Sequence, residues 1–518
     1  MSQSEIETLD VKAVNTGAAA DGSLVEPLYA AREKIHPKRV KGAFRRLKWI
    51  IMAITLGIYY LTPWIRWDRG PFAPDQAVLI DFANRRFYFF FIEIWPQEFF
   101  FVAGLLVMAG VGLFLITSVV GRAWCGYTCP QTVWTDLFLV VERALEGDRN
   151  ARIRLDKAPW GASKVAKRVS KHAIWLVIAV ATGGAWIFYF ADAPTLFWAF
   201  VTFDAPPAAY ITVAILTFTT YTLGGLLREQ VCIYMCPWPR IQAAMLDEDS
   251  LVVTYNDWRG EPRTHGAKRD KETPHGDCID CNACVAACPT GIDIRDGQQL
   301  ECITCALCID ACDDIMGKLG RDKGLISYAT LRDYNQNMAL ATGPDGTIDP
   351  TRVRSEGAFK PEVRRFDWRI FLRVRTLIYF GVWAGIGLLM LAALLARDRM
   401  DVTVQKDRNP VFVQLSDGSI RNGYTLKILN MVPEPRVVFL TLDGLPGAQM
   451  AINEIDQPPG VTFAVEVDPD TLRTLRVFVS QPEFAVEPGR SAFRFLAEDK
   501  QSFETDSYEA IFTAPEED

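Results

Sequence analysis

Eight of the twelve cysteines in this 518-residue chain lie within residues 278–312. Their spacing forms two successive runs, Cys278-x-x-Cys281-x-x-Cys284-x-x-x-Cys288 and Cys302-x-x-Cys305-x-x-Cys308-x-x-x-Cys312. Steps this short let one looping backbone place three thiolates at the corners of an iron–sulfur cubane, as in bacterial ferredoxins. The pattern predicts two [4Fe–4S] clusters and the transfer of single electrons.

In ferredoxins with this spacing, the fourth ligand of each cluster comes from the other run. One cluster is therefore expected on Cys278, Cys281, Cys284 and Cys312, and the second on Cys302, Cys305, Cys308 and Cys288. A zinc ribbon and a disulfide framework are the alternatives. Zinc sites usually leave longer gaps between ligand pairs, and disulfide frameworks belong in oxidising compartments. The spacing favours iron–sulfur clusters.

The other four cysteines form a signature that occurs twice, Cys-x-Tyr-x-Cys-Pro. The first copy holds Cys125 and Cys129, and the second holds Cys232 and Cys236. A step of four residues on a helix places both sulfurs on one face. Because proline cannot easily continue a helix, each pair is expected in the last turn of an apolar helix or just beyond it.

The end of such a helix carries partial negative charge and attracts a cation. Two soft sulfurs at this place, with the thioether of Met235 beside the second pair, would suit Cu(I) better than Cu(II). The alternative is that these thiols pack as small hydrophobic groups. As functional groups, the four cysteines are candidates for a metal site, a redox relay or a support for the adjacent clusters.

Five stretches of the chain carry almost no charge, namely 49–65, 99–121, 173–191, 205–227 and 376–396. Each is near the roughly 20 residues that a helix needs to cross a hydrocarbon core. Aromatic residues at their ends and sharp polar flanks are typical of a membrane interface rather than of buried helices in a large soluble protein. The sequence predicts a polytopic α-helical membrane protein with five transmembrane helices.

The distribution of Lys and Arg orients these helices. The segment before the first apolar stretch has six Lys and Arg between residues 38 and 48, and the loop after the second stretch is also basic. The loop after the third stretch has neither Lys nor Arg. Positive-inside reasoning predicts a cytoplasmic N-terminus and, with five crossings, an external C-terminus. The cysteine runs then lie in the reducing cytoplasm, where thiols stay available to clusters.

The basic loops are accounted for as determinants of topology, and nucleic-acid binding is not expected. No cleavable signal peptide is expected either, because about 48 polar residues precede the first apolar stretch. The predicted plan is a cytoplasmic tail (1–48), four helices in two hairpins that each end in the repeated signature (49–240), a cytoplasmic segment with the ferredoxin-like domain at about 268–320 (241–375), a fifth helix (376–396) and an external domain (401–518).

The external domain contains no cysteine and consists of short alternating stretches separated by turn residues. The stretches at 403–405, 411–415, 423–429, 436–442 and 476–479 predict the strands of an all-β, immunoglobulin-like sandwich. The domain has 20 acidic and 10 basic residues, whereas the other 400 residues have a net charge of +3. The acidity serves solubility or attracts a cationic partner.

Together these features resemble a known family. The two Cys-x-Tyr-x-Cys-Pro copies are similar to those of polyferredoxin-type membrane proteins, and the ferredoxin runs, the fifth helix and the outer sandwich make the chain similar to the CcoG/FixG/RdxA family of cytochrome oxidase accessory proteins. The resemblance implies a protein of the bacterial inner membrane that reduces Cu(II) to Cu(I) for the assembly of cbb3-type cytochrome c oxidase. Implied partners are copper, oxidase subunits or copper-delivery proteins, and an electron donor that is either a quinol or a cytoplasmic reductant.

Two further hypotheses stay open at the level of the sequence. One is a general electron-transfer subunit of the quinol-dehydrogenase type that feeds a periplasmic reductase. The other is a non-enzymatic scaffold whose sandwich binds the oxidase. In the copper hypothesis, the eight ferredoxin cysteines store electrons, and Cys125, Cys129, Cys232 and Cys236 are the candidates for the place where copper meets that store.

Overall fold

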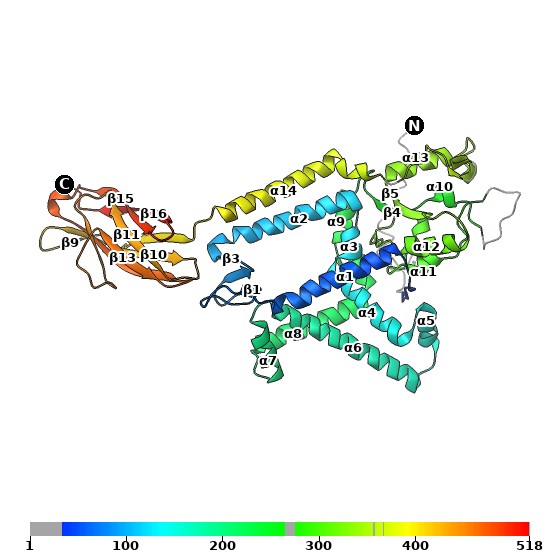
Figure 1. The fold of residues 1–518 in the computed structure, drawn as a ribbon, viewed down its shortest axis with the longest axis horizontal. Coiled ribbons are helices and arrows are strands. Elements are labelled where there is room, and N and C mark those ends of the chain that lie inside the picture. Colours follow the sequence, from blue (N-terminus) through cyan, green and yellow to red (C-terminus); the bar gives the residue numbers. More distant parts are fainter. Residues whose placement is uncertain (1–33, 265–274, 356–357, 366, 517–518) are drawn as a thin grey trace, which may run out of the picture.

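A computed structural model describes residues 34–264, 275–355, 358–365 and 367–516. Residues 1–33 of the expected tail and the beginning of the expected ferredoxin-like domain, up to residue 274, lie outside the described residues. The described chain has three parts along its long axis (Figure 1). A β-sandwich lies at one end, long helices lie in the middle, and the cysteine-rich part lies at the other end.

The middle part contains the long apolar helices. They are α1 (Ala43–Leu61), α2 (Phe100–Val120), α6 (Ala162–Ile187), α8 (Pro207–Thr220) with its π-helical continuation η3 (Tyr221–Leu227), and α14 (Val374–Leu395). Among the described residues, four helical segments are long and apolar enough to cross a membrane, namely Pro96–Val120, Ala162–Ile187, Pro207–Leu227 and Val374–Leu395. Helix α1 is not one of the four, since three basic residues lie within its first six positions.

Small residues let these helices approach closely. Helix α6 packs against α8, where a Cβ on Gly183 would come within 2.9 Å of the Val213 carbonyl oxygen. Helix α2 packs along α14, where a Cβ on Gly104 would come within 2.6 Å of Met390 Sδ. Close packing through glycine is common between membrane helices. Of the two expected hairpins, only the second has this close packing, because α2 takes the distant α14 as its main partner.

Shorter elements connect the long helices. Between α1 and α2 the chain forms a small antiparallel sheet that was not predicted from the sequence, in the order β1-β2-β3. It faces the sandwich, and Arg86 of this sheet forms an ion pair of 3.4 Å with Asp470. The connecting elements of this part are η1 (Thr62–Trp64), β1 (Val78–Asp81), β2 (Arg86–Phe89), β3 (Ile92–Ile94), η2 (Pro96–Glu98), α3 (Ala123–Tyr127), α4 (Pro130–Glu146), α5 (Arg149–Lys157), α7 (Ala193–Val201), η4 (Val231–Met235) and α9 (Trp238–Met245).

The cysteine-rich part is built around a two-stranded antiparallel sheet of β4 and β5, on which the cysteine-bearing helices α11 and α12 pack. Its apolar core includes Val253, Tyr255, Ile309, Met316 and Ile326. The elements are β4 (Val252–Tyr255), α10 (Asp257–Gly260), α11 (Ala283–Ala287), η5 (Ile294–Asp296), α12 (Leu307–Lys318), β5 (Ile326–Ala329), α13 (Leu331–Ala341), η6 (Pro350–Val353), β6 (Arg354–Ser355), β7 (Ala358–Phe359) and η7 (Trp368–Leu372).

The C-terminal part is an all-β sandwich, as predicted. One sheet has the order β12-β14-β10-β8, with β9 also pairing β10, and the other has the order β13-β11-β15-β16. Alternate residues of each strand face the core, and the Tyr424 hydroxyl in β10 donates to the Ile511 carbonyl in β16 at 2.9 Å, which joins the sheets. The strands are β8 (Met400–Lys406), β9 (Val413–Gln414), β10 (Ile420–Asn430), β11 (Arg436–Asp443), β12 (Gln449–Ile452), β13 (Thr462–Val467), β14 (Leu472–Gln481), β15 (Arg490–Asp499) and β16 (Thr505–Thr513), with the short η8 (Glu483–Ala485) before β15.

One carboxylate ties the first long helix to the cysteine-rich part. Asp310 of α12 accepts hydrogen bonds from the backbone N–H groups of Phe44 (3.3 Å) and Arg45 (2.7 Å) in the first turn of α1. The side chain of Asp310 is buried and lies between Cys308 and Cys312 in the sequence. Free N–H groups at a helix start are stabilised by such an acceptor, and a negative charge there also interacts favourably with the helix dipole.

We expect Asp310→Ala to lower the stability of this junction by about 1–2 kcal/mol, the usual range for a lost helix cap. In the full-length purified protein, the iron–sulfur absorbance would then be lost at a lower urea concentration than in the unaltered protein. Asp310→Asn retains one acceptor oxygen, so its urea midpoint should lie between those of Asp310→Ala and the unaltered protein. Equal midpoints for Asp310→Ala and the unaltered protein would show that the contact does not stabilise the cysteine-rich part.

Candidate functional site

The two ferredoxin runs have the same local backbone. In each run the residues before and after the second cysteine have positive φ, at Asp280 and Asn282 in the first run and at Thr304 and Ala306 in the second (51–59°). Non-glycine residues rarely take this conformation, and such strain concentrates at functional sites. In both runs this left-handed backbone flanks the second cysteine and comes directly before α11 or α12 begins.

The third and fourth cysteines of each run are carried by, or next to, a helix. Cys284 lies in α11 and Cys288 is the residue that ends it, whereas Cys308 and Cys312 both lie in α12. The two helices pack together. Cys312 is thereby brought back toward the first loop.

Electrostatic effects among the thiols show which cysteines are neighbours. Burial is the main cause that raises the pKa of Cys312 to about 12, and the nearby thiols that add to it are Cys284, Cys278 and Cys281. Burial also raises the pKa of Cys308 well above its usual value, with further contributions from Cys305, Cys302, Cys288 and Cys284. Cys312 therefore lies near cysteines of the first run, and Cys288 lies near cysteines of the second run.

The surroundings of the second set suit an iron–sulfur cluster. A cavity is lined by Cys288, Cys302, Cys305 and Cys308, by Cys284 of the other set, and by apolar side chains that include Ile292, Ile294 and Ile303. Four thiols that surround one apolar cavity match the ligand set of a cubane cluster. The chemistry of the donor set and its burial both fit [4Fe–4S] groups.

The first Cys-x-Tyr-x-Cys-Pro copy touches the second ferredoxin loop. A Cβ on Gly126 would lie 2.7 Å from the Ile303 carbonyl oxygen and 3.0 Å from Cys305 Cα, so only glycine allows this approach. Beside it, the Tyr127 hydroxyl donates to the Cys305 carbonyl oxygen at 3.2 Å. The membrane-proximal signature is therefore held directly against the backbone of a predicted cluster ligand.

The position of the signature cysteines differs from the sequence prediction. Helix α2 ends at Val120 and is followed by Gly121 with a φ of 59°, so that Cys125 lies in the separate short helix α3. Cys129 is the N-cap of α4, and Pro130 is the first residue of that helix. The first pair thus lies beyond the end of α2, one of the two places predicted, but its cysteines lie on two successive helices and not on one helix face, because Pro130 begins a new helix.

Cys129 lies at the N-terminal end of the 17-residue helix α4 and not at the C-terminal end of α2. In the second copy, Cys232 lies in the π-helical segment η4, Cys236 ends it, and α9 begins after Pro237. Both copies therefore occur at breaks between helices rather than along one helix face.

The two copies converge on one place. Burial is the main cause that raises the pKa of Cys125 to about 12, and Cys129, Cys232 and Cys236 all contribute. Burial likewise raises the pKa of Cys232 to about 11, with contributions from Cys129 and Cys236. We call Cys125, Cys129, Cys232 and Cys236 the four-thiol group. Met235 is 58% exposed, and Cys125 Sγ lies 3.0 Å from the amide oxygen of Gln242 in α9.

Two buried cations lie beside the thiols, and their roles were not predicted. Arg122 is 4% exposed, and its charge opposes the rise in pKa at Cys125, Cys232 and Cys302. It thus lies between the four-thiol group and the second ferredoxin loop. Lys48 of α1 is 3% exposed, and its charge opposes the rise in the pKa of Cys305. In the sequence, both residues resemble ordinary basic residues at the end of a membrane helix.

An ionic network positions the second signature. Glu142 of α4 pairs with Arg152 at 2.8 Å, with Lys171 at 3.4 Å and with Arg228 at 2.6 Å. Burial alone would raise the pKa of Glu142, but Arg228, Lys171 and Arg152 lower it to about 2. Arg228 has a φ of 44° and lies at the break between η3 and η4. The network therefore fixes the turn that leads to Cys232.

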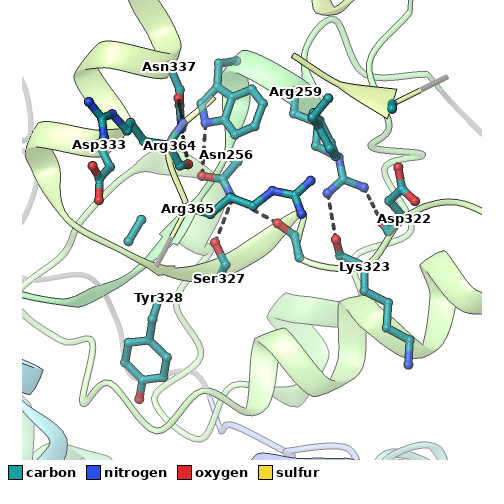
Figure 2. A pocket seen from close by; sticks show the side chains of 15 residues that line it. Asn256, Arg259, Asp322, Lys323, Ser327, Tyr328, Asp333, Asn337, Arg364 and Arg365 are labelled. Carbon is teal, nitrogen blue, oxygen red and sulfur yellow. Dashed lines mark hydrogen bonds between the residues drawn. The ribbon is translucent and has the colours of Figure 1, made fainter. Parts of the chain in front are cut away.

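A polar pocket of about 610 Å³ is lined by residues in and around α10, β5, α13 and β7 (Figure 2). Arg259 closes one side, where it donates to the Lys323 carbonyl oxygen at 2.9 Å and pairs with Asp277 at 2.6 Å. Tyr328 lines the pocket, and its hydroxyl donates to the Thr304 carbonyl oxygen at 3.0 Å. None of the lining residues is a cysteine, so this pocket adds no thiol ligand.

Three family models match the chain. A 4Fe–4S dicluster domain covers residues 227–331, a 4Fe–4S binding domain covers residues 100–146, and the immunoglobulin-like fold at the C-terminus of FixG covers residues 390–515. The nitrogen fixation protein FixG of Rhizobium meliloti (strain 1021) is 63% identical over 98% of this chain and 97% of its own length. The chain belongs to the FixG/RdxA/RdxB family.

Two proteins of Cereibacter sphaeroides extend the family. RdxA is 57% identical over 82% of this chain and 86% of its own length, and RdxB is 51% identical over 94% and 97%. In this FixG-type iron–sulfur protein, the two 4Fe–4S models together span all twelve cysteines. The signature cysteines thus fall within 4Fe–4S family models, although the sequence analysis assigned iron only to the other eight.

We expect the buried charge of Lys48 to stabilise the reduced, more negative state of a cluster on Cys305. Lys48→Met should therefore lower the midpoint potential of that cluster by some tens of millivolts, where about 59 mV is a factor of ten for one electron. A redox titration followed by EPR measures the change. Lys48→Arg keeps the charge and should stay near the unaltered value; a Lys48→Met potential that does not move would contradict the assignment.

Proposed function

We propose that this FixG-type iron–sulfur protein delivers single electrons to Cu(II) and yields Cu(I) for the assembly of cbb3-type cytochrome c oxidase. The supporting observation is the convergence of Cys125, Cys129, Cys232 and Cys236 beside Cys305. Two pairs of soft sulfur ligands would thereby meet copper next to a loop that carries predicted cluster ligands, since Cys125 packs with Ile303 and Cys305. When bound, a [4Fe–4S] cluster supplies one electron at a time, the number that Cu(II) needs to become Cu(I).

The chain's own residues would bind copper and select its oxidation state. Thiolates are soft ligands that hold Cu(I) in preference to harder cations. Because burial raises the pKa of Cys125 and Cys232 to about 12 and about 11, copper must displace protons from these thiols. Arg122 and the N-terminal end of α4 lower the cost of the resulting negative charge. Binding would thus release protons close to the bound metal.

The proposed orientation uses five crossings, with α1 as the first. Beyond its basic start, α1 exposes a row of large apolar side chains, among them Ile50, Ile54, Ile58 and Leu61, which suits a lipid contact. The cysteine-rich part and the sandwich lie at opposite ends of the long helices (Figure 1). We therefore propose a bacterial inner-membrane protein with its N-terminus and cysteine-rich part in the cytoplasm and its C-terminal sandwich in the periplasm.

The partners follow from this orientation. The periplasmic sandwich, with its acidic surplus, would meet oxidase subunits or copper-delivery proteins. Electrons would come from a quinol in the membrane or from a reductant in the cytoplasm, since the cysteine-rich part borders both.

The copper reaction can be tested on anaerobically reduced full-length protein. Addition of Cu(II) should abolish the EPR signal of the reduced clusters, with one Cu(I) formed per electron. Cys125→Ser/Cys232→Ser removes one thiol from each signature and should slow this oxidation at least tenfold with the iron content retained. Thr128→Ser, within the first signature, is the matched control and should behave like the unaltered protein.

Oxidised clusters that a quinol analogue reduces, together with reduced clusters that stay reduced in the presence of Cu(II), would rule out the copper reaction and support the quinol-type relay. Equal oxidation rates for the double variant and Thr128→Ser would show that copper meets the electron store elsewhere.

The orientation can be tested by cysteine-independent labelling in intact cells. An epitope placed after Asp518 should be reached by protease or antibody once the outer membrane is permeabilised, whereas one placed in the turn at Gly343–Thr347 of the cysteine-rich part should stay protected. Protection of both epitopes would contradict the odd number of crossings.

A further inference from the structure

An open, strongly basic cavity lies at the end of α1 that borders the cysteine-rich part. It has a volume of about 740 Å³ and is formed by the start of α1, the residues just before it and the last turns of α4. Five of its ten lining residues are Arg or Lys, namely Arg39, Lys41, Arg45, Arg46 and Arg143. Cavities of this size are typical of small-ligand sites.

Few carboxylates balance this positive charge. Arg45 pairs with Asp136 at 2.9 Å, and the backbone N–H of Arg39 donates to Asp148 at 2.9 Å. Within the part of the chain that the structure describes, the side chains of Lys41 and Arg46 form no ion pair, and both residues are exposed. Burial and the nearby charge of Arg45 lower the pKa of Arg143 to about 10, as expected where cations are crowded.

Two guanidinium groups of this cavity, one on a buried and one on a half-buried residue, have unused hydrogen-bond donors. Arg45 is only 6% exposed, and its Nη2 has no hydrogen-bond partner among the described residues, although the group lies 4.7 Å from the Trp49 ring centroid. Nε of Arg143 also has no hydrogen-bond partner among the described residues. Nη2 of the same group donates to the Pro37 carbonyl oxygen at 3.4 Å. A buried donor without an acceptor is costly, so an acceptor that enters this cavity would stabilise these groups.

The cavity also has an apolar side that continues along α1, the first of the proposed crossings. Trp49, Val140 and Ala144 line it, and the exposed Leu47 and Ile50 follow along α1. An anion with an attached hydrocarbon chain would satisfy both sides at once. Basic pockets between helices at the cytoplasmic surface are places where anionic lipid head groups bind, and Trp is enriched at that level of the bilayer.

We propose that this cavity binds one anionic phospholipid, with the phosphate on Arg45, Arg143, Lys41 and Arg46 and the acyl chains along α1. A soluble phosphate would use only the basic side and would leave the adjoining apolar surface uncovered. The site does not depend on the proposed copper chemistry.

The lipid site is mechanically connected to the cluster loops. Arg45, whose side chain lines the cavity, is also the residue whose backbone N–H donates to Asp310 of α12. Lys48 lies one turn further along α1, and its charge opposes the rise in the pKa of Cys305. Occupation of the cavity therefore holds the first turn of α1 in the position from which it contacts the helix of Cys308 and Cys312.

The proposal is tested with full-length protein in bilayers of equal phosphatidylglycerol and phosphatidylcholine, from which it is extracted in mild detergent and analysed by native mass spectrometry. Phosphatidylglycerol should be retained at least tenfold more than phosphatidylcholine. Lys41→Ser/Arg46→Ser should weaken this retention about 30-fold, since each basic group near an anionic lipid contributes about a fivefold factor. Inorganic phosphate at 10 mM should not displace the retained lipid.

The matched control is Arg154→Ser/Lys157→Ser, which removes two exposed basic residues of α5 on the same side of the protein. It should retain the lipid as the unaltered protein does. Equal retention by the two double variants, no retained phosphatidylglycerol in the unaltered protein, or displacement by inorganic phosphate would each overturn the proposal. Iron content and Cu(II)-dependent oxidation are measured on the same samples. They distinguish a failure of lipid binding from a failure of the copper reaction.

Discussion

The close backbone contact at Gly126 is the constraint on which the arrangement of the thiols depends. A side chain at this position would collide with the carbonyl of Ile303 and with Cys305. Because glycine stands there, the helix break after α2 lies directly against the second ferredoxin loop, and Tyr127 secures it by a hydrogen bond to Cys305. The segments around Tyr127 and Cys305, which are 178 residues apart in sequence, thereby share one packed interface. The four-thiol group and the two ferredoxin runs become neighbours there.

Buried charge is the second feature of this interface. Lys48 and Arg122 are almost fully buried beside thiols that would carry negative charge when they bind metal. An isolated buried cation is costly, so its presence implies a compensating anion. Lys48 has Asp136 as one such partner, whose pKa it lowers against the effect of burial. The clusters that the thiols fit would supply further negative charge.

The fold could be anticipated wherever a local pattern decides it. The alternation of residues in 423–429 and 436–442 predicted β10 and β11, and four of the five apolar stretches form helices long and apolar enough for a membrane. Neither the sheet β1–β3 nor the pairing of α2 with α14 was predicted from the sequence. Strand pairing in a short loop and the choice of helix partner depend on contacts between distant residues, which periodicity does not encode.

The sequence by itself determined the chemistry of this protein: the spacing of the eight ferredoxin cysteines specifies iron–sulfur ligation, and the repeated signature marks Cys125, Cys129, Cys232 and Cys236 as a set. Only the tertiary structure decided where that set lies. Pro130 starts α4 and Pro237 directly precedes α9, so both pairs lie at helix breaks, where they can converge. The same packing brings Lys48 and Arg122 beside the thiols, because a buried side chain acquires its neighbours from the fold and not from its place in the chain.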